Sequence, residues 1–241
     1  MNSEEYRRMF DLEDRYWWFV ARRNLALRLL DERFARGSKI VDLGCGTGAV
    51  LGELEQRAWT LGLDMSQEAL AFCRQRGLPN LVQADGTAIP AGSSQFGAIV
   101  ALDVFEHIES DEKAFAEAFR ILSPGSFLIL SVPAFKTLWG PHDIALMHFR
   151  RYKRPDLSAK LARAGFQVER ISYSVFFLFP IVVLIRIFEK RKTGPAKASL
   201  AKLPNWLNRL LIGIQSLEGS LIQRMNLPWG SSLIAVARKP V

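Results

Sequence analysis

Three aspartates in the first half of the chain each follow a short apolar run of the kind that forms a buried strand. They are Asp42, Asp64 and Asp85, and Asp42 opens the motif D-x-G-x-G-x-G. Alternate glycines let the backbone turn sharply and approach a ligand without an intervening Cβ. Because open α/β sheets bind ligands beyond the carboxyl ends of their strands, we expect the three carboxylates to converge on one site. Negative charge there suits a cationic ligand and repels phosphates.

A dinucleotide-binding loop would read G-x-G-x-x-G, which the present spacing does not match.

The two later aspartates and Cys45 also have a purely structural interpretation. Asp64 could cap a helix that begins at Ser66, and Asp85 could stabilise the turn before Gly86. Cys45, between two of the glycines, is interpreted as a small side chain suited to a tight turn rather than as a nucleophile.

The motif and the spacing of the acids resemble those of class I S-adenosylmethionine-dependent methyltransferases over residues 39–173 and 231–238. The resemblance implies S-adenosyl-L-methionine as cofactor and S-adenosyl-L-homocysteine as product. It further implies that Asp64 binds the ribose hydroxyls, that Asp85 binds the adenine amine, and that cofactor and substrate meet at Asp103, Glu106 and His107. The cofactor-binding candidates are Asp42, Gly44, Cys45, Gly46, Gly48, Asp64, Met65, Asp85, Gly86, Leu102 and Asp103.

The elements that must position these residues alternate along the chain in βαβ order. We expect an α/β fold, namely a Rossmann-like, seven-stranded, mostly parallel sheet with helices on both faces, and the resemblance implies an antiparallel final strand. Strands are predicted at 39–43, before Asp64, Asp85 and Asp103, and at 125–133, 166–173 and 231–239. Helices are predicted at 4–35 with a break near 11–14, from Thr47 onward, and near 67–76, 111–122 and 155–164.

The chain of 241 residues is long enough for one substantial core, and we expect a single methyltransferase domain over 1–241. Its expected parts are an N-terminal helical cap at 1–37, a cofactor-binding core at 38–173, an apolar insertion at 174–230 and the final strand at 231–241. Two cysteines and an acidic N-terminus without an apolar stretch favour a reducing, cytoplasmic setting without a signal peptide.

The insertion at 174–230 is the most unusual feature of the sequence. It carries eight cations and two anions, so its net charge of +6 accounts for most of the +8 of the chain. Its apolar run, Val175 to Ile185, is too short to span a membrane, and a later segment places Trp206, Leu210 and Leu217 on one helical stripe. This pattern predicts a helix lying in a membrane interface, with a helical lid or a homodimer contact as the alternative.

Methyl transfer to a hydroxyl requires a base and an aligned acceptor. His107 is the first candidate for the catalytic base, His148 is the second, and His142 is a further alternative, although a structural histidine at 107 would fit the same pattern. The run Asp103-x-x-Glu106-His107 resembles a metal-holding segment of some ubiquinone-biosynthesis O-methyltransferases, but no further ligand follows from spacing and no metal is assigned. The substrate-binding candidates are Tyr16, Trp17, Trp18, His142, Arg150, Arg151 and Tyr152.

The sequence therefore predicts an S-adenosylmethionine-dependent enzyme that O-methylates a hydrophobic or lipid-linked small molecule at the cytoplasmic face of the membrane. A nucleic-acid methyltransferase is the first alternative. We expect no nucleic-acid partner, because the cations of the insertion interleave with apolar residues in helical phase. A noncatalytic protein that binds S-adenosylmethionine, or a scaffold, is the second alternative, because the motif predicts binding and not turnover.

Overall fold

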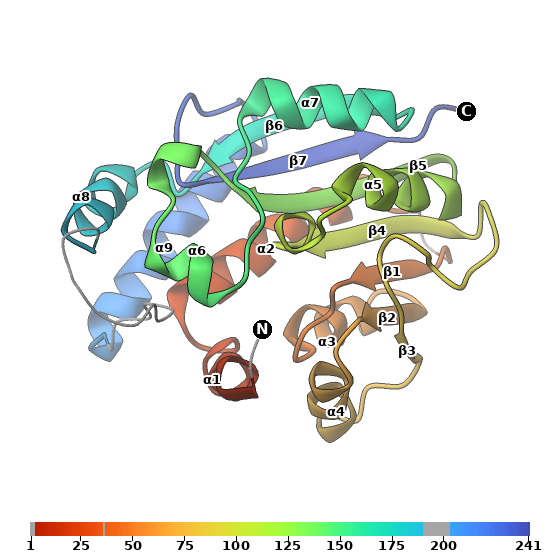
Figure 1. Cartoon of the computed structure of the whole chain (residues 1–241), viewed down its shortest axis with the longest axis horizontal. Helices are drawn as coiled ribbons and strands as arrows, with labels where there is room; N and C mark the ends of the chain where they lie inside the picture. Colours follow the sequence, from red (N-terminus) through yellow and green to blue (C-terminus); the bar gives the residue numbers. More distant parts are fainter. Residues whose placement is uncertain (1–2, 36, 190–202) are drawn as a thin grey trace.

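The computed structural model describes residues 3–35, 37–189 and 203–241. Over these ranges the chain forms a seven-stranded sheet in the order β3-β2-β1-β4-β5-β7-β6 (Figure 1). The antiparallel strand β7 lies between β5 and β6, and the parallel pairs link β3 through β5. This confirms the predicted Rossmann-like α/β fold. The strands are β1 (Ile40–Leu43), β2 (Thr60–Asp64), β3 (Leu81–Gln83), β4 (Phe96–Leu102), β5 (Leu122–Pro133), β6 (Gln167–Ser174) and β7 (Ser232–Arg238).

Helices cover both faces of the sheet (Figure 1), and the sheet separates the two larger of three core clusters. Alternate residues of β4 point to opposite faces, as strand geometry requires: Val100 joins one cluster, and Ile99 and Ala101 join the other. The helices α5 (Asp111–Ile121) and α7 (Arg154–Arg163) cover the face of Ile99 and Ala101, and α2 (Trp17–Asp31) and α9 (Asn205–Ile222) cover the face of Val100. The remaining helices are α1 (Ser3–Leu12), α3 (Ala49–Glu55), α4 (Gln67–Gln75), α6 (Pro141–Ala145) and α8 (Phe179–Glu189).

The observed elements differ from the predicted ones mainly at their ends. The long N-terminal helix is broken between Leu12 and Trp17, close to the predicted position. Strand β5 begins at Leu122, three residues before the predicted start, because Leu122 pairs with Phe96 across an irregularity in the ladder. The helix that follows β2 starts at Gln67, and Ser66 caps it by accepting a hydrogen bond from the Ala69 amide.

The insertion between β6 and β7 contains α8 and α9, and α9 packs against α2. The face of α9 that turns inward is partly polar, since Gln215, Glu218 and Gly219 are buried with Ile222. The predicted apolar stripe turns outward instead, and Trp206 and Leu217 are 67% and 68% exposed. None of the described helices is both long enough and apolar enough to cross a membrane.

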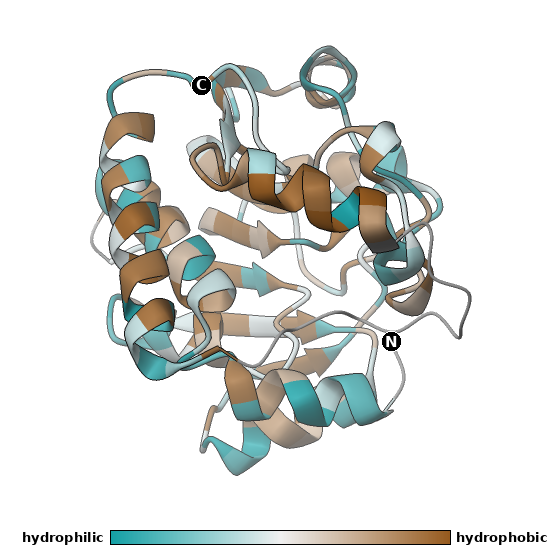
Figure 2. Ribbon diagram, turned by 90° about the vertical axis from the view of Figure 1, so that its left-hand side faces the viewer, coloured by the Kyte–Doolittle hydropathy of each residue, from teal (hydrophilic) through white to brown (hydrophobic). Residues whose placement is uncertain are grey.

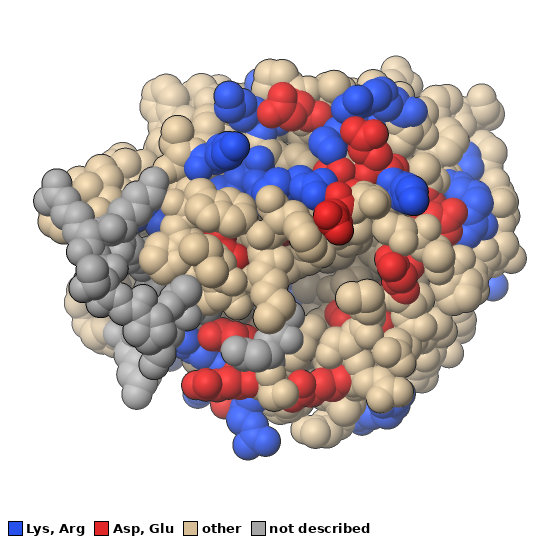
Figure 3. Space-filling model, viewed as in Figure 1, with Lys and Arg blue, Asp and Glu red and all other residues tan. Residues whose placement is uncertain are grey.

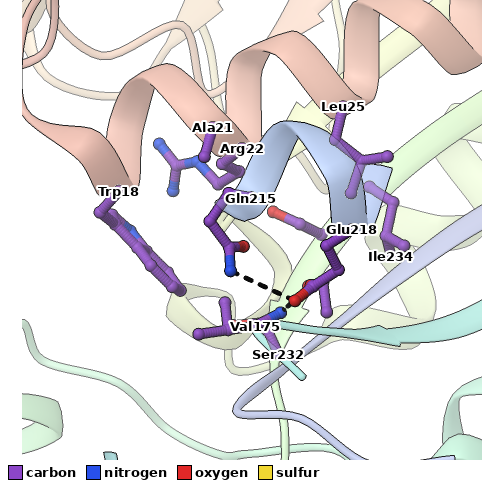
Figure 4. Close-up of a pocket in the computed structure, with 11 residues that line it drawn as sticks. Trp18, Ala21, Arg22, Leu25, Val175, Gln215, Glu218, Ser232 and Ile234 are labelled. Carbon is purple, nitrogen blue, oxygen red and sulfur yellow. Dashed lines mark hydrogen bonds between the residues drawn. The ribbon is translucent and has the colours of Figure 1, made fainter. Parts of the chain in front are cut away.

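Buried Glu218 attaches α9 to the end of β6. Its carboxylate accepts hydrogen bonds from the backbone amide of Val175 and from the Gln215 side chain (Figure 4). It also accepts one from the backbone amide of Phe177. Val175 has a left-handed backbone, with φ of 62°, so this segment depends on its hydrogen bonds for its shape.

We expect Glu218→Ala to lower the stability of the protein by about 2–5 kcal/mol, because it leaves one buried and one partly buried amide without an acceptor. For a chain of this size the midpoint of thermal unfolding should fall by roughly 5–15 °C. Glu218→Gln is the matched control, since its amide oxygen still accepts one of the two bonds and its loss should be smaller. Equal melting curves for the alanine variant and the wild type would contradict this role of Glu218.

Candidate active site

A cavity of about 970 Å³ opens at the carboxyl ends of the parallel strands. The surface is hollowed at this edge, with acidic side chains around the opening (Figure 3). The structure brings together ten of the predicted cofactor-binding residues along its wall: Asp42, Gly44, Cys45, Gly46, Asp64, Met65, Asp85, Gly86, Leu102 and Asp103. Gly48 is the exception, because it precedes α3 with φ of +97° and does not line the cavity. Its predicted contact with cofactor is corrected to a role in the turn.

The glycine-rich loop is held in place by Asp64. One carboxylate oxygen accepts from the Gly46 amide at 2.9 Å, and the other accepts from the Ser66 amide at 2.9 Å. Gly44 has φ of +69°, and a Cβ there would lie 2.4 Å from Cγ2 of Val104. The loop can therefore pack against Val104 at this position only because the residue is glycine.

Asp42 is buried at the base of the cavity, and its Oδ2 has no hydrogen-bond partner. Burial, reinforced by the nearby charges of Asp64 and Glu13, raises the pKa of Asp42 to about 8. A positively charged ligand would offset this cost by favouring the carboxylate. The orphaned oxygen and the glycine cradle therefore fit the sulfonium and ammonium groups of S-adenosylmethionine, which supplies an electrophilic methyl group when bound.

Asp103 lies at the end of β4 and forms an ion pair with Arg22 of α2. It also accepts a hydrogen bond from the Ser131 hydroxyl at 2.8 Å. Burial opposes its ionisation, but the charge of Arg22 and the bond from Ser131 hold the pKa of Asp103 below its usual value. Arg22 thus places a cation beside the point at which the resemblance predicted that cofactor and substrate meet.

The N-terminal helices close one side of the cavity. Tyr16, Trp17 and Trp18 line it, as their assignment to the substrate site requires. The corner between α1 and α2 is tied to the glycine-rich loop by Glu13, which accepts hydrogen bonds from the Thr47 hydroxyl and from Arg76. This arrangement places aromatic rings over the cofactor-binding edge of the sheet.

The part of the cavity away from the glycine-rich loop is apolar. Helix α8 contributes Ile181, Val182 and Ile185, and α9 contributes Leu207 and Leu211. The same two helices carry exposed apolar residues on their outer surfaces, and Figure 2 views the molecule from this end. The wall of the cavity and the outer apolar surface are therefore formed by the same helices.

All three histidines of the chain line the cavity. Burial lowers the pKa of His107 to about 3, and burial also lowers that of His142 to about 3. The Nδ1 atom of His148 lies 3.0 Å from Oδ1 of buried Asp143. The rings of His107 and His148 meet edge to face, with their centroids 4.6 Å apart.

Glu106 is fully buried beside these histidines, and neither of its carboxylate oxygens has a hydrogen-bond partner. Potential ligand atoms of Glu106, His107 and His148 lie within 4.8 Å of one another, a spacing that could hold a cation. This group differs from the Asp103, Glu106 and His107 run of the sequence, since Asp103 is engaged by Arg22. We assign no metal to the group.

The structure corrects the placement of three predicted substrate contacts. Tyr152 is 2% exposed and donates its hydroxyl to Asp111 at 2.7 Å, so its ring belongs to the core. Arg150 also pairs with Asp111 and does not line the cavity. Arg151 does line it, but its guanidinium pairs with the Asp143 carboxylate at 2.7 Å and is therefore not available to bind an anionic group of a substrate.

Some residues of the cavity were not predicted as site residues. Arg22 lies 81 residues before Asp103 in the sequence, so spacing carried no signal for this pair. Asp143 lies behind the cavity wall and only five residues before His148, but the sequence does not show that the two side chains meet. Leu207 and Leu211 belonged to the predicted amphipathic helix, and only the packing of α9 shows that they face the cavity.

Comparison with known proteins agrees with this geometry. Residues 41–130 match a family model described as a methyltransferase domain. A probable S-adenosylmethionine-dependent methyltransferase of Mycolicibacterium smegmatis is 28% identical over 65% of this chain and 62% of its own length. A ubiquinone biosynthesis O-methyltransferase of Pseudomonas aeruginosa is 28% identical over 61% of this chain and 72% of its own. A tRNA (carboxymethyluridine(34)-5-O)-methyltransferase of Arabidopsis thaliana is 32% identical, over 42% of this chain and 25% of its own.

The chain thus spans less than two thirds of the mycobacterial and plant relatives. Among solved structures, a methyltransferase of Thermotoga maritima described as a possible histamine N-methyltransferase superposes with a TM-score of 0.63. That alignment covers 98% of this chain and 95% of the other at 17% identity, which shows the shared fold alone. The family match, the relatives and the fold agree on one conclusion: residues 41–130 form a methyltransferase domain, and the chain has the fold of the class I S-adenosylmethionine-dependent methyltransferases.

Proposed function

We propose that the protein O-methylates a hydrophobic or lipid-linked small molecule while it contacts a membrane surface peripherally. The observation that carries this proposal is the two-part cavity. One part is lined by the acidic strand ends that receive the cofactor, and the other is lined by apolar residues of α8 and α9. A volume of about 970 Å³ lies at the upper end of the range for small-molecule sites and leaves room for an acceptor beside the cofactor.

The outer surface of the insertion supports the membrane part of the proposal. Leu184 and Phe188 of α8 are 55% and 60% exposed, and Trp206 and Leu217 of α9 are still more exposed. Exposed apolar surface of this extent is rare on proteins without a binding partner. The insertion has a net charge of +6, which matches the negative surface of a bilayer that contains anionic lipid.

The activities named for the relatives bear on the acceptor. The Pseudomonas protein is a ubiquinone biosynthesis O-methyltransferase, and it matches more of this chain than the plant tRNA-modifying enzyme does. This favours a small acceptor that is methylated on oxygen. A nucleic-acid acceptor and a noncatalytic role remain the outcomes to be separated by experiment.

Membrane contact predicts flotation with vesicles. The wild type should float with vesicles that contain one third anionic lipid and less with neutral vesicles, because apolar insertion and charge attraction act together. The double variant Trp206→Ser with Leu217→Ser should reduce the floated fraction at least about fivefold, because both side chains would insert into the interface. Trp59→Ser is the matched control, since Trp59 is also exposed but precedes β2 at the opposite edge of the sheet. Equal flotation of all three proteins would remove membrane contact from the proposal.

The acceptor class is tested by following a labelled methyl group from S-adenosylmethionine into fractions of a cell extract. We expect label in the lipid fraction that depends on Asp64. Label in RNA instead would support the nucleic-acid alternative. Binding of S-adenosylmethionine without label in any fraction would support a noncatalytic role.

A further inference from the structure

We infer that Asp143 positions His148 as the proton acceptor of the reaction, so that the methylated group is a hydroxyl of phenol-like acidity. The inference rests on the proposed methyl transfer and adds the group that receives the proton and the kind of hydroxyl that it can serve.

The carboxylate of Asp143 is buried, and hydrogen bonds to both of its oxygens hold it in place. Its side chain is fully buried, and Oδ1 accepts from Nε of Arg151 at 2.7 Å. Oδ2 accepts from Nη2 of Arg151 at 3.1 Å and from the Gly140 amide at 2.9 Å. Burial opposes ionisation, but the bonds from His148 and Arg151 outweigh it and hold the pKa of Asp143 below its usual value. Asp143 is therefore a carboxylate and can only accept hydrogen bonds.

This charge state determines the tautomer of His148. Because Oδ1 of Asp143 can only accept, Nδ1 of His148 must carry the proton of the 3.0 Å hydrogen bond. The other nitrogen, Nε2, then keeps its lone pair in a ring that lines the cavity. The backbone holds the ring as well, since the His148 amide donates to the Asp143 carbonyl at 2.9 Å and the next amide, of Phe149, donates to the Glu106 carbonyl at 2.7 Å.

The other two histidines are poor bases by comparison. Burial lowers the pKa of both His107 and His142 to about 3, so neither readily accepts a proton at neutral pH. His148 has a buried carboxylate, that of Asp143, which is positioned to stabilise the imidazolium that proton transfer creates.

The chemistry of imidazole limits the acceptor. Imidazole has an unperturbed pKa near 6.5 and a phenol near 10, so a transfer between them is feasible as the oxygen begins to bond. The hydroxyl proton moves to Nε2 of His148 while the oxygen bonds to the methyl carbon. The electron pair of the carbon–sulfur bond leaves with the sulfur, and His148 later returns the proton to water.

NMR of the histidine rings tests the interaction between Asp143 and His148 without substrate. The chain has three histidines, so long-range proton–nitrogen spectra should resolve each ring, with assignment by single glutamine variants. We expect His148 as the Nδ1–H tautomer in the wild type. In Asp143→Asn the amide NH₂ can donate to Nδ1, which converts the ring to the Nε2–H form. An Nε2–H ring in the wild type, or an unchanged tautomer in Asp143→Asn, would overturn the inference.

Kinetics with matched probes test the acceptor. The wild type should methylate 4-hexylphenol and not 4-hexylaniline, which has the same tail. Asp143→Asn and His148→Gln should each reduce kcat for the phenol at least about a hundredfold with KM changed less than threefold. Asp156→Asn, an exposed change on α7, is the control and should retain wild-type rates. If Asp143→Asn does not fold, His148→Gln carries the test.

The outcomes separate this inference from the proposed function. Methylation of the aniline in preference to the phenol would overturn the hydroxyl assignment. Transfer that requires an added divalent cation and survives Asp143→Asn would make His148 a ligand and not a base. A wild type that binds S-adenosylmethionine but methylates neither probe would contradict the proposed acceptor. The tautomer of His148 in the NMR experiment would still show whether Asp143 positions His148.

Discussion

Replacing Asp64 with alanine is expected to weaken the binding of S-adenosylmethionine at least about a hundredfold. The carboxylate accepts the amides of Gly46 and Ser66 at 2.9 Å each, so it fixes both the glycine-rich loop and the start of α4. A carboxylate has about four lone-pair positions, so Asp64 can hold both amides and still accept the ribose hydroxyls that the resemblance assigns to it. Hydrogen bonds to a charged group contribute about 1.5–3 kcal/mol each, and losing two of them reaches this magnitude.

Isothermal titration with S-adenosylmethionine and S-adenosylhomocysteine measures the effect. Asp85→Ala is an informative comparison, because Asp85 is exposed and bonds only within its turn, to the amide and hydroxyl of Thr87. Asp85→Ala should weaken the binding of S-adenosylmethionine nearer tenfold, which corresponds to the loss of about one hydrogen bond. Asp156→Ala should bind as the wild type does, and melting curves establish that each variant is folded. An affinity within threefold of the wild type for Asp64→Ala would exclude Asp64 as the anchor of the loop.

The cofactor half of the site could be predicted because its geometry is local in sequence. Each acid lies at or just beyond the end of a strand, and parallel strands bring their carboxyl ends to one edge, so the sequence predicts that Asp42, Asp64 and Asp85 lie together. Gly48 was predicted to contact the cofactor, but it precedes the first turn of α3. The spacing of the glycines does not show which of them faces the ligand and which begins the helix.

The acceptor half could not be predicted in the same way. Its parts come from α2, the segment around α6, and the insertion, and more than a hundred residues separate α2 from the other two. Whether Arg151 faces substrate or Asp143 depends on how α6 packs, and nothing in the run of cations shows it. The apolar stripe of α9 was recognised, but its direction depends on Glu218, whose buried bonds turn the polar face inward.

Affinity for S-adenosylmethionine is expected to rise as the pH increases from 6 to 8. Burial, Asp64 and Glu13 raise the pKa of Asp42 to about 8, while Arg22 opposes the rise, so the free protein holds a proton there at neutral pH. A cation beside Asp42 favours the carboxylate, so binding must release that proton. Each pH unit below about 8 should then weaken binding up to about tenfold.

The stability of the free protein should change in the opposite direction. Between the unfolded pKa near 3.8 and the folded pKa near 8, the native state binds more protons at Asp42 than the unfolded state does. Its contribution to stability is therefore present at low pH and is lost as the pH rises through this window, by up to about 1.4 kcal/mol per unit. The opposed slopes distinguish Asp42 from a group that simply strengthens the native fold at higher pH.

Titration in buffers of different ionisation enthalpy measures the released proton directly. At pH 7 we expect release of close to one proton per cofactor, and almost none at pH 9. In Asp42→Asn both the release and the pH slope should disappear. His107 and His142, with pKa values near 3, cannot supply a slope in this range. A slope that persists in Asp42→Asn would therefore assign the proton to another group and separate Asp42 from the recognition of the donor's positive charge.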